Sequence, residues 1–104
     1  MTDRPTLIVP LDYRAREILK AIILGMVLSR VHSRWYMTES LGKNPAKHRV
    51  PDEEALGYLI DHSYIAQNNG GWRITEAGRE HLRENHADML RSAAACLKAD
   101  WSSL

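Results

Sequence analysis

Apolar residues recur in the first third of the chain at the spacing of one helical face. Between Tyr13 and Val31 they fall at positions 15, 18, 19, 22, 23, 26, 27 and 31, and Leu24 and Leu28 widen the face. Asp12 is a suitable N-cap for such a helix. The pattern predicts a central helix over about 13–31, in which Gly25 indicates close approach of another backbone.

The segments on either side of this helix have different patterns. Residues 1–11 carry two prolines around a short apolar run, which predicts an extended N-terminal arm. Residues 33–38 predict a short strand, a short helix should run from Thr38 to Gly42, and residues 43–50 form a loop. Pro51 and three following acids predict a helix that ends near His62.

The stretch from Ile65 to Ile74 predicts a β-hairpin. If Asn69 and Gly70 form a two-residue type I′ turn, Ile65 lies opposite Ile74 and Gln67 opposite Trp72, with Arg73 on the other face. The expected tip comprises Asn69, Gly70 and Gly71.

Thr75 is a suitable N-cap for a last helix over about 76–101. A helix of this length extends beyond what so small a domain covers, and its apolar stripe predicts a homodimer contact. The expected dimer interface comprises Leu90, Ala93, Ala94, Leu97 and Trp101.

Composition and charge narrow the class of protein. The 104 residues suit one domain, 12–104, and the single cysteine excludes an internal disulfide. No apolar run reaches the roughly 20 residues of a membrane-spanning helix, and the N-terminus lacks the order of a signal peptide, so we expect a cytoplasmic protein. Residues 1–50 have nine Lys/Arg against four Asp/Glu, whereas residues 51–104 have five against nine.

The element order and residues 55–82 resemble winged helix-turn-helix regulators of the MarR-like and PadR-like families. The resemblance rests on Leu56 and Leu59, on the Gly-rich hairpin, and on the sequence Ile-Thr-Glu-Ala-Gly-Arg over 74–79. It implies a mainly α (α+β) fold with a β-hairpin wing and a long C-terminal helix. It also implies a dimeric transcriptional regulator, bacterial or phage in type, that binds double-stranded DNA.

The basic stretch between positions 30 and 49 has one acid, Glu39, and suits a phosphate-binding surface. The resemblance adds the loop before the third helix and the wing as phosphate contacts. The expected DNA-binding residues are Arg30, Arg34, Lys43, Lys47, His48, Arg49 and Arg73.

The expected third helix presents acidic side chains where such regulators contact bases, and carboxylates repel a polyanion. An alternative function therefore keeps the fold and replaces DNA by a protein: an adaptor or phage-encoded inhibitor that binds a basic partner surface. The residues of this alternative face are Asp52, Glu53, Glu54, Tyr58 and Asp61.

Catalytic chemistry has little support in the sequence. No phosphate-binding glycine loop or nucleophile motif is present, and we expect neither catalytic residues nor a cofactor. Among the five histidines, His81 and His86 are five positions apart, which is not the i,i+4 spacing of ligands on one helix. We therefore expect no metal site.

Overall fold

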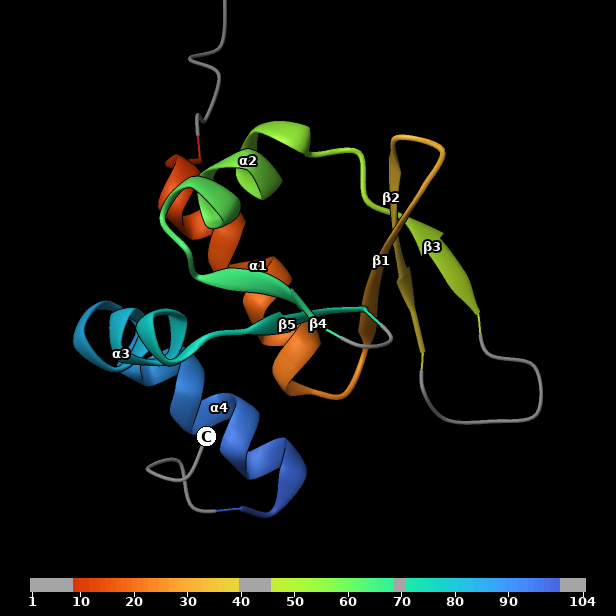
Figure 1. Ribbon diagram of the computed structural model, residues 1–104. Helices are drawn as coiled ribbons and strands as arrows, with labels where there is room; N and C mark the ends of the chain where they lie inside the picture. Colours follow the sequence, from red (N-terminus) through yellow and green to blue (C-terminus); the bar gives the residue numbers. More distant parts are fainter. Residues whose placement is uncertain (1–8, 40–45, 69–70, 100–104) are drawn as a thin grey trace, which may run out of the picture.

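A computed structural model describes residues 9–39, 46–68 and 71–99. They form a mixed α+β fold of four helices and a five-stranded antiparallel sheet with strand order β3-β2-β1-β5-β4 (Figure 1). The elements are α1 (Leu11–Ile23), β1 (Val27–Val31), β2 (Arg34–Thr38), β3 (Lys47–Arg49), α2 (Glu53–Asp61), β4 (Ile65–Asn68), β5 (Gly71–Ile74), α3 (Glu76–Asn85) and α4 (Ala87–Leu97).

The first helix is shorter than its apolar pattern predicts. Gly25 has a φ of 101°, and its N–H donates to the carbonyl of Ile22 while the N–H of Met26 donates to that of Ala21. These two bonds form a Schellman cap, whose left-handed position favours glycine. The predicted continuation to Val31 is therefore wrong, because the helix ends just before Gly25. The close approach of another backbone at Gly25 stays a prediction. The predicted N-cap at Asp12 is also wrong, because Pro10 caps the helix and Asp12 lies in its first turn.

The residues after α1 form strands. Val31 pairs with Arg34 across a turn in which His32 and Ser33 both have positive φ, the conformation of a type I′ turn. The strand expected over 33–38 is confirmed as β2. The helix expected from Thr38 is wrong at Thr38 itself, which belongs to β2, and residues 40–45 lie outside the described part of the chain.

The loop predicted before α2 contains β3, which pairs with β2. Between β1 and α2 the described residues include strands and no helix, so the first helix of a helix-turn-helix is not found there. The expected helix after Pro51 is confirmed as α2, which Asp52 caps by accepting a hydrogen bond from the N–H of Ala55.

The hairpin of β4 and β5 has the predicted register. Ile65 pairs with Ile74 and Gln67 with Trp72, and Asn68 pairs with Gly71. The expected tip residues Asn69 and Gly70 lie outside the described residues. The hairpin is not isolated, because Trp72 also pairs with Leu28 of β1, which joins β5 to the rest of the sheet.

The single C-terminal helix predicted over 76–101 is wrong, because the chain bends at His86 between α3 and α4. His86 has φ −138° and ψ 41°, outside the helical region, yet its N–H still donates to the carbonyl of Leu82. The bend turns α4 against α1 and buries Leu90 and Ala93.

The predicted N-cap of α3 at Thr75 is confirmed, because the N–H of Gly78 donates a 3.1 Å hydrogen bond to the Thr75 hydroxyl oxygen.

The core lies between the helices and one face of the sheet. Leu28, Trp35 and Met37 are buried on that face, where the Trp35 and Trp72 rings meet edge to face with centroids 5.0 Å apart. In Figure 1 the helices gather on one side of β1, and β2 and β3 extend away from them. None of the described helices has the length and apolarity to cross a membrane.

Two helical glycines provide a test of this packing. A Cβ added at Gly78 would lie 2.9 Å from Ile74 Cγ1 and still closer to the carbonyl oxygen of Tyr64, whereas nothing lies within 4 Å of one added at Gly57. Gly78→Ala should therefore lower the free energy of unfolding by roughly 1–3 kcal/mol. Gly57→Ala should raise it by up to about 1 kcal/mol through helix propensity.

Urea denaturation of the two variants checks this prediction. Because both substitutions are Gly→Ala within a helix, the difference between them isolates the close approach of Gly78 to the Tyr64 carbonyl. Equal stabilisation of both variants would contradict the packing of α3 against the start of β4.

Candidate functional site

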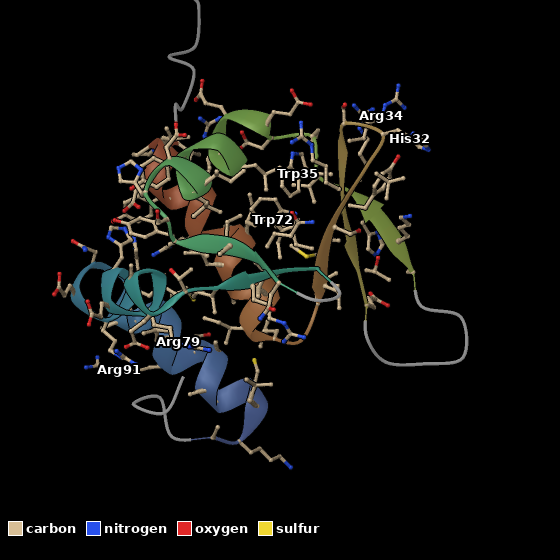
Figure 2. The ribbon with its side chains drawn as sticks, in the orientation of Figure 1. His32, Arg34, Trp35, Trp72, Arg79 and Arg91 are labelled. Atoms are coloured by element: carbon tan, nitrogen blue, oxygen red, sulfur yellow. The ribbon has the colours of Figure 1, made fainter. Side chains whose placement is uncertain are left out.

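The predicted phosphate-binding residues are exposed and come from four strands. Arg30 lies on β1, Arg34 on β2 and Arg73 on β5, and β3 carries Lys47, His48 and Arg49. Lys43 lies outside the described residues. Figure 2 shows Arg34 and His32 at the opposite end of the molecule from Arg79 and Arg91.

Cross-strand pairing divides these residues between the two faces of the sheet. Side chains alternate along a strand, and paired residues share a face. Arg34 pairs with Val31 and Lys47 with Thr38, which places both basic residues on the face opposite Leu28. Arg49, paired with Tyr36, shares this face.

The same alternation places Arg73 on that face, because its neighbour Trp72 pairs with Leu28 on the core side. We call this surface the outer sheet face. Its described strand residues are Val27, Ser29, Val31, Arg34, Tyr36, Thr38, Lys47, Arg49, Ala66, Asn68, Gly71 and Arg73. They include four cations and no carboxylate.

Tyr36 lies among the cations of the outer sheet face. It pairs with Arg49, and the Lys47 Nζ lies 4.6 Å from the centroid of its ring. Val27 and Val31 on the neighbouring strand are each 39% exposed. The surface thus combines positive charge with an aromatic ring and aliphatic side chains.

Arg30 and His48 do not join this surface. Arg30 pairs with Trp35 on the core face, and its guanidinium lies 5.4 Å from the centroid of that ring. His48 pairs with Met37, also on the core face, and its Nε2 lies 3.6 Å from Glu39 Oε1. The structure therefore separates these two predicted contacts from the other four.

The acidic face expected on α2 is largely engaged within the chain. Arg14 of α1 contacts both Asp52, at 3.5 Å, and Glu54. The Tyr58 hydroxyl donates a 2.9 Å hydrogen bond to Asp12. Only Glu53 and Asp61 of the five expected residues are exposed without such a described contact to another helix.

The residues expected at a dimer contact are mostly in the core. Leu90, Ala93 and Ala94 are buried against the chain itself, so they cannot contact a second copy in this fold. The physical reason is the bend at His86, which packs α4 onto α1. Leu97 is exposed, and Trp101 lies outside the described residues.

A partly buried polar cluster lies where the four helices meet. Asp12 Oδ1 is 2.7 Å from His81 Nε2, and Asp12 Oδ2 is 2.6 Å from His86 Nε2. The Tyr58 hydroxyl donates to the same carboxylate, as described above, and the Tyr64 hydroxyl lies 3.2 Å from His81 Nδ1. We call Asp12, His81 and His86 the Asp-His-His cluster.

The cluster has a consistent arrangement of protons in the metal-free protein. The Nδ1 of His86 lies 3.3 Å from Arg16 Nη1, and that of His81 lies 3.1 Å from Asn85 Nδ2. Arginine is only a donor, so the facing Nδ1 accepts and the Nε2–H of His86 donates to Asp12. His81 has the same tautomer when Asn85 presents its NH₂ group, as it does here.

Burial by itself raises the pKa of Asp12, but the hydrogen bonds from His81, His86 and Tyr58 outweigh burial and hold the pKa below its ordinary value of 3.8. Burial also raises the pKa of Tyr58 to about 12, with the bond to Asp12 and the nearby negative charge adding to the shift. Both shifts favour a charged carboxylate beside a neutral phenol.

One continuous helix over 76–101, as the sequence predicts, would keep this cluster from forming. Five residues of helix rotate a side chain by about 140° past a full turn, which separates positions 81 and 86. The bend at His86 removes this separation, and no glycine or proline near it signals the bend in the sequence.

The lowered pKa of Asp12 predicts a pH-dependent stability. Since the folded-state pKa lies below the unfolded one, the stabilisation is complete above the ordinary pKa and is lost as the pH falls through the folded-state value. Asp12→Asn should remove this dependence and lower the free energy of unfolding near pH 7 by roughly 1–3 kcal/mol.

Urea denaturation in metal-free buffer between pH 7 and about pH 2 measures this component. Asp61→Asn, at an exposed position near the end of α2, is the matched control and should keep the pH dependence of the original protein. Parallel pH profiles for Asp12→Asn and the original protein would contradict the prediction.

Comparison of the chain with protein-family models, curated proteins and solved structures finds no match. The similarity to MarR-like and PadR-like regulators therefore rests on residues 55–82 and on element order alone. The comparisons neither support nor contradict it.

Proposed function

We propose that the protein binds nucleic acid, in the first place double-stranded DNA, through the outer sheet face. The observation that carries this proposal is the charge of that face: Arg34, Lys47, Arg49 and Arg73 are exposed there, with no carboxylate among its described strand residues. Such an unbalanced surface attracts a polyanion and releases its counterions on binding.

The arrangement of the cations suits a phosphate backbone. Lys47 and Arg49 are two residues apart on one strand, which separates their Cα atoms by about 7 Å, and neighbouring strands are about 4.8 Å apart. Long flexible side chains at these spacings reach several phosphates of one duplex. Tyr36 adds a hydroxyl and a ring at the centre of the same surface.

We propose that the protein binds DNA with little preference for base sequence. Contacts to phosphates position a protein on DNA but do not specify a sequence. The helix α2 offers Glu53 and Asp61 on its exposed side, and carboxylates there repel the phosphates that flank a major groove. We therefore infer that the sheet, not a recognition helix, makes the main contact.

Transcription regulation is the proposed context of this binding. The hairpin β4–β5 follows α2 and precedes α3, as the wing does in the regulators that residues 55–82 resemble, and its Arg73 is exposed. A winged-helix assignment and a homodimer remain part of the proposal. The alternative, a protein partner on the acidic side of α2, is supported by the exposed carboxylates of Glu53 and Asp61, which have no described contact to another helix.

Charge reversal on β3 tests the proposal. The original protein should bind a random-sequence duplex with an affinity that falls steeply as salt rises, with a slope of log K against log salt of about −0.9 for each phosphate contact. The double variant Lys47→Glu with Arg49→Glu should abolish binding at moderate salt, because it replaces two attractions by two repulsions. Fluorescence anisotropy over a salt series measures both.

The matched control reverses two charges at the other end of the molecule. Arg91→Glu with Lys98→Glu changes the net charge by the same amount, and Figure 2 shows Arg91 far from Arg34. This control should bind DNA with the original salt slope and nearly the original affinity. No binding of the original protein at low salt, or equal losses in both double variants, would refute the proposal.

A second prediction tests which face of the sheet is used. Arg30 and Arg34 flank the same turn and have the same charge, but only Arg34 belongs to the outer sheet face. Arg34→Gln should make the salt slope shallower by about 1 for any duplex sequence, whereas Arg30→Gln should leave it unchanged. A larger effect at Arg30 would place the contact on the other face.

A further inference from the structure

We propose that Asp12, His81 and His86 bind one divalent transition-metal ion of the zinc class. Their ligand atoms, one carboxylate oxygen and two imidazole nitrogens, all lie within 4.8 Å of one another. Zn²⁺ binds such atoms at about 2.0–2.2 Å, which places ligands of a tetrahedral site about 3.4 Å apart. His81 contacts Asp12 Oδ1 at 2.7 Å and His86 contacts Asp12 Oδ2 at 2.6 Å. For one of these oxygens to bind the metal with both imidazoles, its present contact must open by less than about 1 Å and the carboxylate must turn toward the other ring.

The ligands are held by elements that are far apart in the sequence and packed together in the core. Asp12 comes from the first turn of α1, His81 from α3, and His86 from the junction of α3 and α4. His86 is 2% exposed, so its ring has little freedom. A set of ligands fixed in this way loses little conformational freedom when the metal binds.

One side of the cluster is open to solvent. The side chains of Asp12 and His81 are 32% and 17% exposed, in contrast to the buried His86. The metal enters from this side, and water completes its coordination. Three protein ligands with an open position differ from the closed four-ligand sites that serve only structure.

Polar groups around the ligands suit a metal site at two of the three positions. The Tyr58 hydroxyl donates to the Asp12 carboxylate and orients it. Coordination by Nε2 leaves the proton of His81 on Nδ1, and the Tyr64 hydroxyl oxygen, 3.2 Å away, accepts it. The Asn85 NH₂ group, which lies 3.1 Å from the same Nδ1, then keeps only its hydrogen bond to the His81 carbonyl oxygen.

His86 requires one rearrangement. Its Nδ1 becomes a donor when Nε2 binds a metal, and it then faces the Arg16 guanidinium, which is also a donor. Arg16 contacts His86 at 3.3 Å and lies over the Tyr13 ring, 4.5 Å from its centroid. Its Nε has no hydrogen-bond partner but lies 3.8 Å from Glu17 Oε1. The guanidinium therefore gives up its contact with His86 as the metal binds and turns toward Glu17, whose side chain is 64% exposed.

Loading the site exchanges two hydrogen bonds for three coordination bonds. Each imidazole stays neutral: its Nε2 proton leaves to solvent, its Nδ1 takes up a proton from solvent, and the freed Nε2 lone pair binds the metal. The Asp12 carboxylate keeps its charge and moves from two N–H donors to the cation. Two imidazoles and one carboxylate favour Zn²⁺, Co²⁺ or Fe²⁺ over Mg²⁺ and Ca²⁺, which prefer oxygen ligands.

Metal titration of the full chain, purified without a histidine tag and treated with a chelator, tests the site. Calorimetry with Zn²⁺ should give one ion per chain, and Co²⁺ should produce the visible absorption of a nitrogen-coordinated ion. His81→Gln should weaken binding at least about tenfold. This variant keeps a polar side chain at a partly exposed position, so that the fold survives; circular dichroism and urea denaturation check it.

His32→Gln is the matched control, because His32 is exposed in the β1–β2 turn, whereas the cluster is carried by α1, α3 and the junction of α3 and α4. It should bind Zn²⁺ as the original protein does. Absence of binding to the folded original protein would overturn the proposal. So would equal affinities of the original protein and the His81→Gln variant, since the ion would then occupy other histidines.

The site and the outer sheet face are independent in their tests. The variant that tests DNA binding changes Lys47 and Arg49 on β3, whereas the variant that tests metal binding changes His81 on α3. Failure of either proposal therefore leaves the other standing.

Discussion

The carboxylate of Asp12 holds the helical half of the molecule together. It accepts hydrogen bonds from Tyr58 of α2, His81 of α3 and His86 at the junction of α3 and α4. A partly buried charge is costly unless such partners surround it, so the helices can pack here only in the arrangement that supplies all three donors. The bend at His86 is part of this arrangement, because a straight helix would carry that imidazole away from Asp12.

The packing of the helices also determines which face of the sheet is covered. Because α4 folds back onto α1, the helices form one layer that covers a single face of the sheet, where Leu28 and Trp35 are buried. The opposite face has no layer over it among the described residues. Its side chains must therefore be compatible with water, and four of them are the cations on which the proposed DNA contact rests.

The two candidate sites use different physics. The outer sheet face acts through long, exposed side chains whose attraction to a polyanion depends on total charge and on salt. The Asp-His-His cluster acts through short, directional contacts among groups that packing holds in place. Composition alone can reveal a charged surface such as the outer sheet face. The Asp-His-His cluster exists only after residues 12, 81 and 86 have been brought together.

Local chemistry in the sequence determined the elements whose signals lie within a few residues of one another. The register of Ile65 with Ile74, the cap at Thr75 and the helix after Pro51 each follow from neighbouring residues, and each is confirmed. The basic character of residues 30–49 was likewise visible, although not the faces to which its members point. Alternation assigns side chains to the two faces of a sheet only where a segment is known to be a strand. The apolar spacing of the residues that form β1 instead predicts a helix.

Tertiary structure alone decided the rest, because it depends on contacts between distant segments. The pairing of Leu28 with Trp72 makes a strand of residues that also fit a helix. The packing of α4 on α1 bends the chain at His86 and takes Leu90, Ala93 and Ala94 out of the surface. The stabilising free energy comes from contacts between residues far apart in the sequence. Leu28 and Trp72 are 44 positions apart, and Asp12 and His86 are 74 apart. No local pattern in the sequence could therefore predict these contacts.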